Sequence, residues 1–435
     1  MDSRFKLAGR STLADPQRPR SRNTSTTSIK ISNPSNSRVP PRPQYPYSPD
    51  PYNSTFKSSA TRSIYSYSKP TEYSSPVKVD YVRQSREIPK TTEITAVPRQ
   101  DSMGLVGLRN LGNTCYMNSI LQCLVHTPCL NEAFMSRDFP DEINRSSKLR
   151  GELAIKFKEL IKEFKELPRN SSVSPYNIKS LIGRISSQFL GYSQQDAAEL
   201  LRAMLEGLHL DLNRVRTKPS YRQMTGSLKE GLEEVARTWW EYSLSRDNSI
   251  ITDTFQGQLL SMITCKACNH KSISCDSFLD LTLPIPQYSK VSLLDCFKSF
   301  VKEGNLPSYK CENCKKPDNC KQEVTLYRFP KVLVLQLKRF TVNGFRREKL
   351  SNEINLPEVL RLEEFAPHST SSNVSKARYR LYGVSNHMGG LSFGHYVADC
   401  VDQGSWYCFD DSRVSPTETP TRSSSAYVLF YYRID

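Results

Sequence analysis

The pattern of apolar and polar positions divides the chain into two parts that meet near residue 104. In residues 1–100 the apolar positions follow no period, and Ser, Thr, Pro, Tyr and Arg dominate. Such a stretch cannot bury enough apolar surface to offset the entropy lost on ordering it, so we expect a disordered tail. From residue 104 to 435 helical and strand patterns continue without a second stretch of this kind, which predicts one folded domain.

Helical periodicity comes first in the folded part. Apolar residues spaced three and four apart predict amphipathic helices over 115–125 and 150–167. A third helix is expected to open with a capping box formed by Ser193 and Asp196. Its buried stripe would be Leu200, Leu201, Met204, Leu205 and Leu208.

Short β-prone runs dominate from residue 255 onward. The run 332–335, Val-Leu-Val-Leu, is typical of a buried strand. Because the helices precede the strands and do not alternate with them, the order predicts an α+β domain with an antiparallel sheet. The predicted strands are 255–263, 273–283, 323–340, 379–386, 395–401, 405–409 and 426–432.

The sequence contains no run of 18 apolar residues, and its charged N-terminus lacks the apolar core of a secretory signal. We therefore expect a cytoplasmic protein, and import into the nucleus is compatible with that expectation. In a reducing compartment the 12 cysteines would serve in metal binding, in catalysis or as small buried side chains.

The basic charge lies mostly in the tail. The chain has a net charge of +16, and residues 1–100 hold 17 Lys and Arg against 7 Asp and Glu. We interpret the tail mainly as a solvated arm, and contacts with acidic proteins, anionic membranes or nucleic acid stay open.

Cys115 lies where a turn meets a predicted helix, in the segment 107–119, GLRNLGNTCYMNS. A thiol attacks as its thiolate, and the backbone N–H groups at a helix start lower the pKa of a cysteine placed there. Thr114 is the expected N-cap. Asn110 carries an amide that can donate to a developing oxyanion. The pattern favours a catalytic thiol, and the alternative for an isolated cysteine is a small buried side chain.

His395 follows a glycine-containing segment, 388–394, and begins a β-prone run. An imidazole can take the proton of a thiol and later return it to a leaving amine. A hairpin with the run 405–409 would bring Asp410 beside this imidazole, where a carboxylate fixes the tautomer and stabilises the imidazolium. The alternative is that Asp410 and Asp411 form a polar turn.

Two Cys-x-x-Cys pairs indicate a metal site. Four thiolates suit a closed, tetrahedral, structural Zn²⁺. The gap between the pairs is longer than in common zinc ribbons, so we expect the pairs on separate hairpins. A redox pair or unliganded thiols are the alternatives, and Cys275 and Cys320 lie nearby. The four candidate ligands are Cys265, Cys268, Cys311 and Cys314.

These segments together resemble the ubiquitin-specific protease family. The segments that carry the resemblance are GLRNLGNTCYMNSILQCL at 107–124, YSQQDAAE at 192–199, YGVSNHMGGLSFGHYVADC at 382–400 and WYCFDDS at 406–412. Within the family, the chain most resembles the subgroup in which a compact domain follows a basic, disordered N-terminal arm.

The resemblance implies a papain-like cysteine protease fold over residues 104–435, with a helical thumb, a β-rich palm and zinc-stapled fingers at roughly 255–325. It implies hydrolysis of isopeptide or peptide bonds at the C-terminal glycine of ubiquitin by a thiol mechanism. It also implies one structural zinc ion, ubiquitin and ubiquitinated proteins as partners, and a monomeric catalytic domain.

The resemblance also assigns residues. Cys115 corresponds to the nucleophile, His395 to the base and Asn110 to the oxyanion donor. Asp410 corresponds to the third catalytic residue, and Asp411 to a neighbouring acid that can share its role. The zinc ligands correspond to Cys265, Cys268, Cys311 and Cys314. The ubiquitin-binding positions are Gln195, the acids Asp196 and Glu199, which would meet the basic tail of ubiquitin, and Tyr396, beside the channel for its Gly-Gly end.

One position departs from the family pattern. Phe393 stands where the family often has the first glycine of Gly-Gly-His-Tyr. We expect it to narrow the channel or to alter the adjoining loop, with a quantitative effect on activity.

The sequence also bears on two rival functions. A catalytically inactive ubiquitin-binding scaffold would lack a member of the triad, and none is missing. A nucleic-acid-binding protein would need a basic fold module, whereas the basic excess lies in a tail that contains none.

Overall fold

Residues 104–434 are described in this computed structural model, except 225, 228–230, 289, 344–345, 368–376 and 391–392. The predicted disordered tail lies outside the described residues. The chain divides into two units, and all described residues belong to the second, 90–435.

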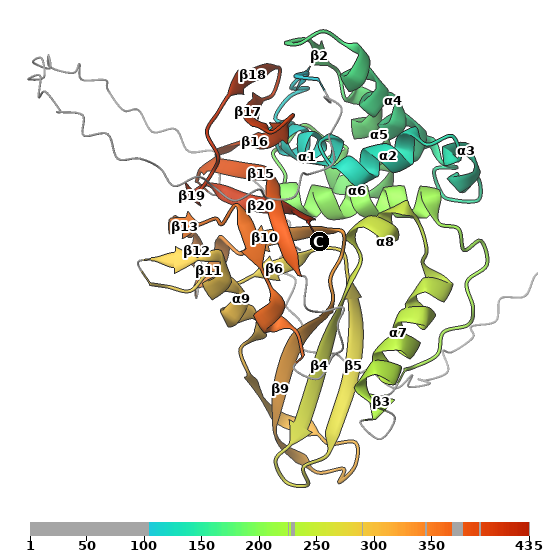
Figure 1. The fold of residues 1–435 in the computed structure, drawn as a ribbon, viewed down its shortest axis with the longest axis vertical. Helices are drawn as coiled ribbons and strands as arrows, with labels where there is room; N and C mark the ends of the chain where they lie inside the picture. Colours follow the sequence, from blue (N-terminus) through green and yellow to red (C-terminus); the bar gives the residue numbers. More distant parts are fainter. Residues whose placement is uncertain are drawn as a thin grey trace, which may run out of the picture. The chain divides into compact units, whose positions relative to one another are not determined.

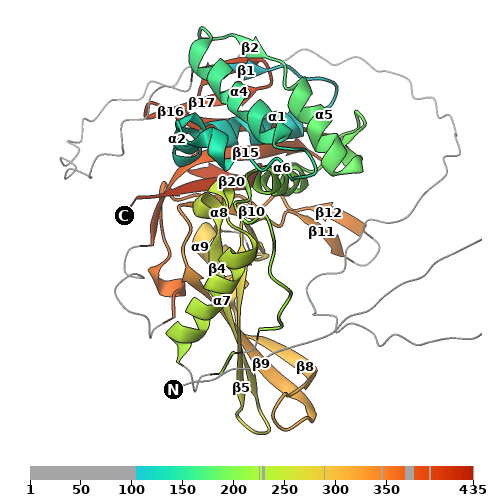
Figure 2. The ribbon, with the colours of Figure 1, turned by 90° about the vertical axis from the view of Figure 1, so that its right-hand side faces the viewer.

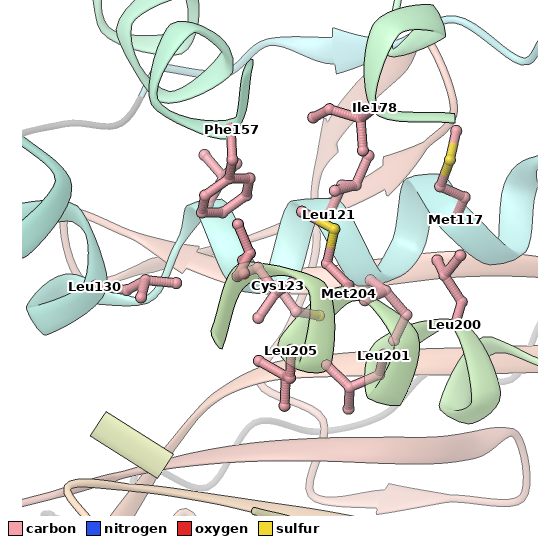
Figure 3. Close-up of a cluster of buried hydrophobic side chains, with 14 of the residues drawn as sticks. Met117, Leu121, Cys123, Leu130, Phe157, Ile178, Leu200, Leu201, Met204 and Leu205 are labelled. Carbon is pink, nitrogen blue, oxygen red and sulfur yellow. The ribbon is translucent and has the colours of Figure 1, made fainter. Parts of the chain in front are cut away.

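The helical layer forms around three helices that the apolar periodicity predicts. They are α1 (Cys115–Val125), α4 (Glu152–Glu166) and α6 (Ala197–Leu212). Figure 3 shows Met117 and Leu121 of α1 among Leu200, Leu201 and Met204 of α6. Every residue of α1 is buried. The layer is completed by α2 (Pro128–Met135), α3 (Phe139–Glu142), α5 (Tyr176–Ile185), α8 (Ile250–Phe255) and the parallel pair β1 (Gly107–Leu108) and β2 (Ser172–Val173).

The predicted capping box at Ser193 is wrong. The helix begins four residues later, and Asp196 itself is the N-cap: its Oδ1 accepts from the backbone N–H groups of Ala198 at 2.8 Å and Glu199 at 3.0 Å. A carboxylate at this position satisfies two unpaired N–H groups and complements the positive end of the helix dipole.

The central sheet is largely antiparallel, as predicted, and α1 packs against its strands β16 and β15 (Figure 1). The pair β10–β6 is parallel, and β14 (Val359–Arg361) pairs with β15. The strand order is β18 (Arg413–Pro416), β17 (Ser405–Asp410), β16 (Gly394–Asp402), β15 (Arg378–Gly389), β20 (Ala426–Arg433), β10 (Val332–Leu337) and β6 (Leu281–Leu283).

Two predicted strands are each divided. The run 273–283 becomes two strands, and 323–340 spans three, with a break around Pro330, which has no N–H to donate to a sheet. One smaller sheet is the hairpin of β11 (Phe340–Asn343) and β12 (Arg346–Lys349). Another consists of β19 (Arg422–Ser423), β13 (Ile354–Asn355) and β7 (Val291–Ser292). Helix α9 (Leu293–Val301) directly follows β7 in the chain.

A second, five-stranded sheet extends away from the central one in Figures 1 and 2. Helix α7 (Leu232–Arg246) packs against its strand β5. The order is β3 (Gly226–Ser227), β5 (Lys271–Phe278), β4 (Gly257–Cys265), β9 (Pro317–Arg328) and β8 (Gly304–Lys310). Among the described residues, no helix is long and apolar enough to cross a membrane.

Candidate active site

Cys115 is the first residue of α1, as predicted, and only 2% of it is exposed. Thr114 occupies the N-cap position, but its side chain makes no cap hydrogen bond. Its hydroxyl instead accepts from the backbone N–H of Leu111 at 2.8 Å. The predicted N-cap position of Thr114 is confirmed, but its side chain stabilises the turn that precedes the helix and not the first N–H groups of the helix.

The Cys115 thiol has a pKa above its ordinary value. Burial raises its pKa above the ordinary value, the backbone N–H of Tyr396 lowers it, and the charge of Asp411 raises it. Burial dominates because a thiolate loses hydration that the helix start does not replace. The predicted lowering by the backbone N–H groups at the helix start is present, at Cys115 and Tyr116, but burial outweighs it.

The hairpin predicted to join His395 and Asp410 is present. Strands β16 and β17 pair antiparallel, and His395 Nε2 lies 2.6 Å from Asp410 Oδ1. The bond fixes the ring orientation and leaves Nδ1 as the second nitrogen of the imidazole. The structure thus gives His395 a hydrogen bond to Asp410, while a carboxylate oxygen of Asp411 lies within 4.8 Å of the imidazole.

Asp411 binds the nucleophile segment instead. Its backbone is in the left-handed region, with a φ of +51°. Its Oδ2 accepts from Asn110 Nδ2 at 2.9 Å, and its Oδ1 accepts from Asn118 Nδ2 at 2.7 Å. Its backbone carbonyl accepts from the N–H of Leu108 at 2.8 Å. Asp411 therefore joins the β17–β18 turn to both the loop before α1 and the helix itself.

Asn118 is a site residue that the sequence reasoning missed. It lies on α1 one turn after Cys115 and is 2% exposed. The only signal in the sequence was that Asn118 is a polar residue beside the apolar stripe of a helix. Its partner, Asp411, lies 293 positions away in the chain.

The start of α6 lies beside the strand that carries His395. Asp196 Oδ2 accepts from the hydroxyl of Tyr427 at 2.5 Å, so both carboxylate oxygens have partners. Glu199 and Gln195 are partly exposed. Gln194, which the sequence reasoning did not select, donates its side-chain amide to the carbonyl of Gly394. This contact ties the segment before α6 to the residue preceding His395.

Tyr396 is buried, and its ring lies 4.6 Å from that of His387 between ring centroids. Burial raises its pKa above the ordinary value, with further contributions from Asp196 and Glu199. A Cβ at Gly394 would lie 2.0 Å from His387 Nε2, so only glycine fits there. Phe393, in contrast, is 83% exposed.

The four predicted metal ligands come together at the turns of two hairpins, β4–β5 and β8–β9. Their sulfur atoms all lie within 4.8 Å of one another, with Cys265 to Cys314 at 4.0 Å and Cys268 to Cys311 at 3.6 Å. Sulfur atoms on one tetrahedral zinc, each at about 2.3 Å from it, lie about 3.8 Å apart, so the set fits such an ion. Cys275 and Cys320 do not belong to this group of ligands.

The backbone of the first knuckle also suits a thiolate. The N–H of His270 at the Cys268 sulfur is the largest cause of the lowered pKa of that thiol, whereas desolvation raises the pKa of the neighbouring Cys265 thiol. A thiolate is the form in which cysteine binds a metal.

Comparison with known proteins agrees with this geometry. The sequence profile of the ubiquitin carboxyl-terminal hydrolase family matches residues 106–431. The chain is 42% identical over 342 residues to ubiquitin carboxyl-terminal hydrolase 2 of Bos taurus, covering 76% of this chain and 55% of that protein. It is 38% identical over 351 residues to ubiquitin carboxyl-terminal hydrolase 21 of Homo sapiens, covering 75% and 61%.

A solved structure shares the fold. The SAGA Ubp8/Sgf11/Sus1/Sgf73 DUB module bound to ubiquitin aldehyde matches with a TM-score of 0.60 and 28% identity, covering 79% of this chain and 72% of that one. The present chain spans little more than half the length of the bovine relative. Because the family profile covers the helical layer, both sheets and the Cys115–His395 region, this chain belongs to the ubiquitin carboxyl-terminal hydrolase family.

Proposed function

We propose that this chain is a thiol-dependent deubiquitinase that hydrolyses isopeptide or peptide bonds at the C-terminal glycine of ubiquitin. The observation that carries the proposal is the 2.6 Å contact between His395 and Asp410 on strands against which the helix of Cys115 packs. Family membership and a solved relative bound to ubiquitin aldehyde support ubiquitin as the substrate.

In the proposed reaction His395 takes the proton of Cys115 through Nδ1, because Nε2 is held by Asp410. The thiolate attacks the carbonyl carbon of the ubiquitin C-terminal glycine. The protonated imidazole then gives its proton to the departing amine, leaving a thioester. A water molecule, deprotonated by the same imidazole, hydrolyses that thioester and restores the thiol.

Asn110 is the proposed oxyanion donor. Its amide has two N–H bonds, and the one used on Asp411 leaves the other for the developing negative charge. Asp411 and Asn118 would be positioning residues that act through Asn110. Asp410 would be the residue that orients the imidazole, which assigns the two neighbouring acids different tasks.

The raised pKa of Cys115 constrains this proposal. Because burial raises the pKa of the Cys115 thiol, forming the thiolate depends on transfer of its proton to His395. Active sites of this kind often tighten only in the substrate complex.

Binding of the ubiquitin tail is assigned to the start of α6. Asp196 and Glu199 would attract its basic residues, and Gln195 and Tyr396 would line the approach to Cys115. The Asp196 charge can act at short range although both of its oxygens have hydrogen-bond partners.

Zinc is the proposed metal of the four-cysteine group. Cys265, Cys268, Cys311 and Cys314 would hold it. Four protein ligands leave no open coordination position, so the ion would staple the two hairpins together and take no part in hydrolysis.

The deciding experiment is hydrolysis of a fluorogenic ubiquitin C-terminal amide by the full chain, with Cys115→Ala as the matched inactive variant. Turnover by the wild type that Cys115→Ala abolishes would support the proposal. Ubiquitin binding without turnover by the wild type would favour an inactive ubiquitin-binding scaffold. Cytoplasmic location and a monomeric catalytic domain remain predictions.

A further inference from the structure

Two exposed apolar side chains flank the candidate base. Met388 is 44% exposed and Phe393 is 83% exposed, the highest value for a large apolar side chain in the described part of the chain. Single exposed apolar residues are common on protein surfaces. Two exposed apolar side chains close to a proposed catalytic imidazole indicate a contact with another molecule, because removing apolar surface from water is favourable.

The sheet register places Met388 and His395 on the same face. In the antiparallel pair β15–β16, Met388 lies directly opposite His395 and His387 directly opposite Tyr396. Side chains of directly opposed residues point to one face, and successive residues alternate between faces. Met388 and His395 therefore share one face of the ribbon, while His387 and Tyr396 point to the other.

The opposite face is the one that approaches α6. The ring of Tyr396 lies 6.3 Å from that of Tyr427, whose hydroxyl donates to Asp196. The charges of Asp196 and Glu199 also act on Tyr396. The proposed anchor for the ubiquitin tail is thus on the Tyr396 face, away from Met388.

The backbone that presents Phe393 is held in place. The N–H of Gly390 donates to the carbonyl of Phe393 at 2.8 Å, and Gly389 has a φ of +92°. Lys349 Nζ donates to the carbonyls of both Gly389 and His387 at 2.8 Å. These bonds hold the backbone of Gly389 and of Phe393, the residue that carries the exposed ring, which lowers the entropy cost of contact with a ligand.

We propose that Met388 and Phe393 form an apolar contact surface for the protein that carries the ubiquitinated lysine. The inference rests on the proposed function and adds a leaving-group site to it. His395 must come within hydrogen-bond reach of the departing lysine nitrogen in order to protonate it. Met388, which shares the face of the imidazole, and Phe393, two residues before His395 in the chain, are therefore placed to meet the leaving chain. The chemistry that fits is a leaving segment with an apolar side chain next to the lysine.

The test compares two kinds of substrate on the full chain. One is the fluorogenic ubiquitin amide, whose leaving group is small. The other is ubiquitin joined by an isopeptide bond to a lysine peptide, made with either Leu or Ser next to the lysine. The variants are Phe393→Ser and Met388→Ser, with Tyr221→Ser as a control at a side chain that is 78% exposed and lies between α6 and β3.

We expect the wild type to prefer the Leu peptide conjugate over the Ser conjugate. In Phe393→Ser that preference, expressed as a ratio of kcat/KM values, should fall by about 10-fold, the low end for loss of an apolar contact. Met388→Ser should also lower the preference for the Leu conjugate, and Tyr221→Ser should leave that preference unchanged. The ratio of conjugate to fluorogenic-amide hydrolysis should fall in parallel.

Equal losses on the amide and on both conjugates would place Phe393 on the ubiquitin side and overturn the inference. Unchanged ratios in both variants would overturn it as well. In either case an active wild type keeps the proposed function intact. A wild type inert on all three substrates would instead overturn the proposed function, and this inference with it.

Discussion

The carboxylate of Asp411 holds the side-chain amide of Asn110, whose Nδ2 donates to Asp411 Oδ2 across 2.9 Å. The preceding residue, Asp410, contacts His395 instead. Two adjacent acids thus serve two different groups. The left-handed φ of Asp411 turns its side chain towards the nucleophile loop.

If Asp411 acts through Asn110, the two residues form one energetic unit. Asn110→Ala should lower kcat on the ubiquitin amide by about 100-fold, as loss of an oxyanion donor does. Asp411→Ala should lower kcat by a comparable factor. The double variant should have a kcat little lower than that of either single variant. Steady-state kinetics of the three variants measures this coupling.

The control for that cycle pairs Asn110→Ala with Asp410→Ala. Here the two changes affect different groups, so the double variant should lose considerably more than either single one. Thermal unfolding of each protein checks that losses in kcat do not come from a partly unfolded chain. Multiplicative losses in the Asn110–Asp411 pair would contradict the positioning role of Asp411.

Metal analysis addresses the four-cysteine group. We expect one zinc ion per chain. Cys311→Ser should lose it, because only three of the four thiolates that a closed tetrahedral site needs would remain. Cys275→Ser is the matched control: Cys275 lies on the same sheet and is buried, but does not belong to the ligand group. Its zinc content should equal that of the wild type.

Loss of zinc should also have a local effect. Amide hydrogen exchange should rise in the β4–β5 and β8–β9 turns of Cys311→Ser, while exchange in α1 stays slow. Equal zinc content in wild type and Cys311→Ser would rule out the assigned site.

The parts of the site that the sequence predicted are those set by local patterns. The start of α1 at Cys115 follows from a turn sequence and an apolar stripe. The approach of Asp410 to His395 follows from two adjacent strands and a short turn, a geometry that spacing alone encodes.

The missed parts depend on contacts that are distant in sequence. Gln194 meets Gly394 across 200 positions, and Asn118 meets Asp411 across 293. The pKa of Cys115 depends on how deeply the sheet covers the helix start, which no local pattern contains. The N-cap of α6 is Asp196 and not the predicted Ser193, and the carboxylate of Asp196 also bonds Tyr427, a residue of the last strand.

Stability at mildly acidic pH should depend on His387. Burial, with a smaller contribution from Lys349, lowers its pKa from 6.5 to about 4. Between those values the unfolded chain binds a proton that the folded chain does not, so stability falls as the pH falls. The loss from this one group, complete below pH 4, is about 3 kcal/mol. Above pH 6.5 the group has no effect.

Urea unfolding of wild type and His387→Gln between pH 7.5 and 4.5 measures this contribution. The difference in unfolding free energy between the two proteins should change with pH in favour of the variant as the solution becomes acidic. Other titrating groups, including the buried His126, are present in both proteins and cancel. Parallel pH profiles would contradict the assignment.

Asp196 combines a structural and a proposed binding role, and two substitutions separate them. Asp196→Ala removes the cap of α6 and leaves the Tyr427 hydroxyl without its acceptor, so it should cost about 2 kcal/mol of stability. Asp196→Asn keeps a capping oxygen and a group that can bond Tyr427, so its unfolding free energy should stay within about 1 kcal/mol of wild type.

The Asn variant therefore isolates the charge. If the carboxylate attracts the basic tail of ubiquitin, Asp196→Asn should raise KM for the ubiquitin amide several-fold with kcat nearly unchanged, since the contact is made equally in ground and transition states. Added salt should raise the wild-type KM more than that of the variant, because screening acts on a charge that the variant lacks. A variant with wild-type KM at low salt would show that Asp196 serves the helix alone, and the tail would then depend on Glu199.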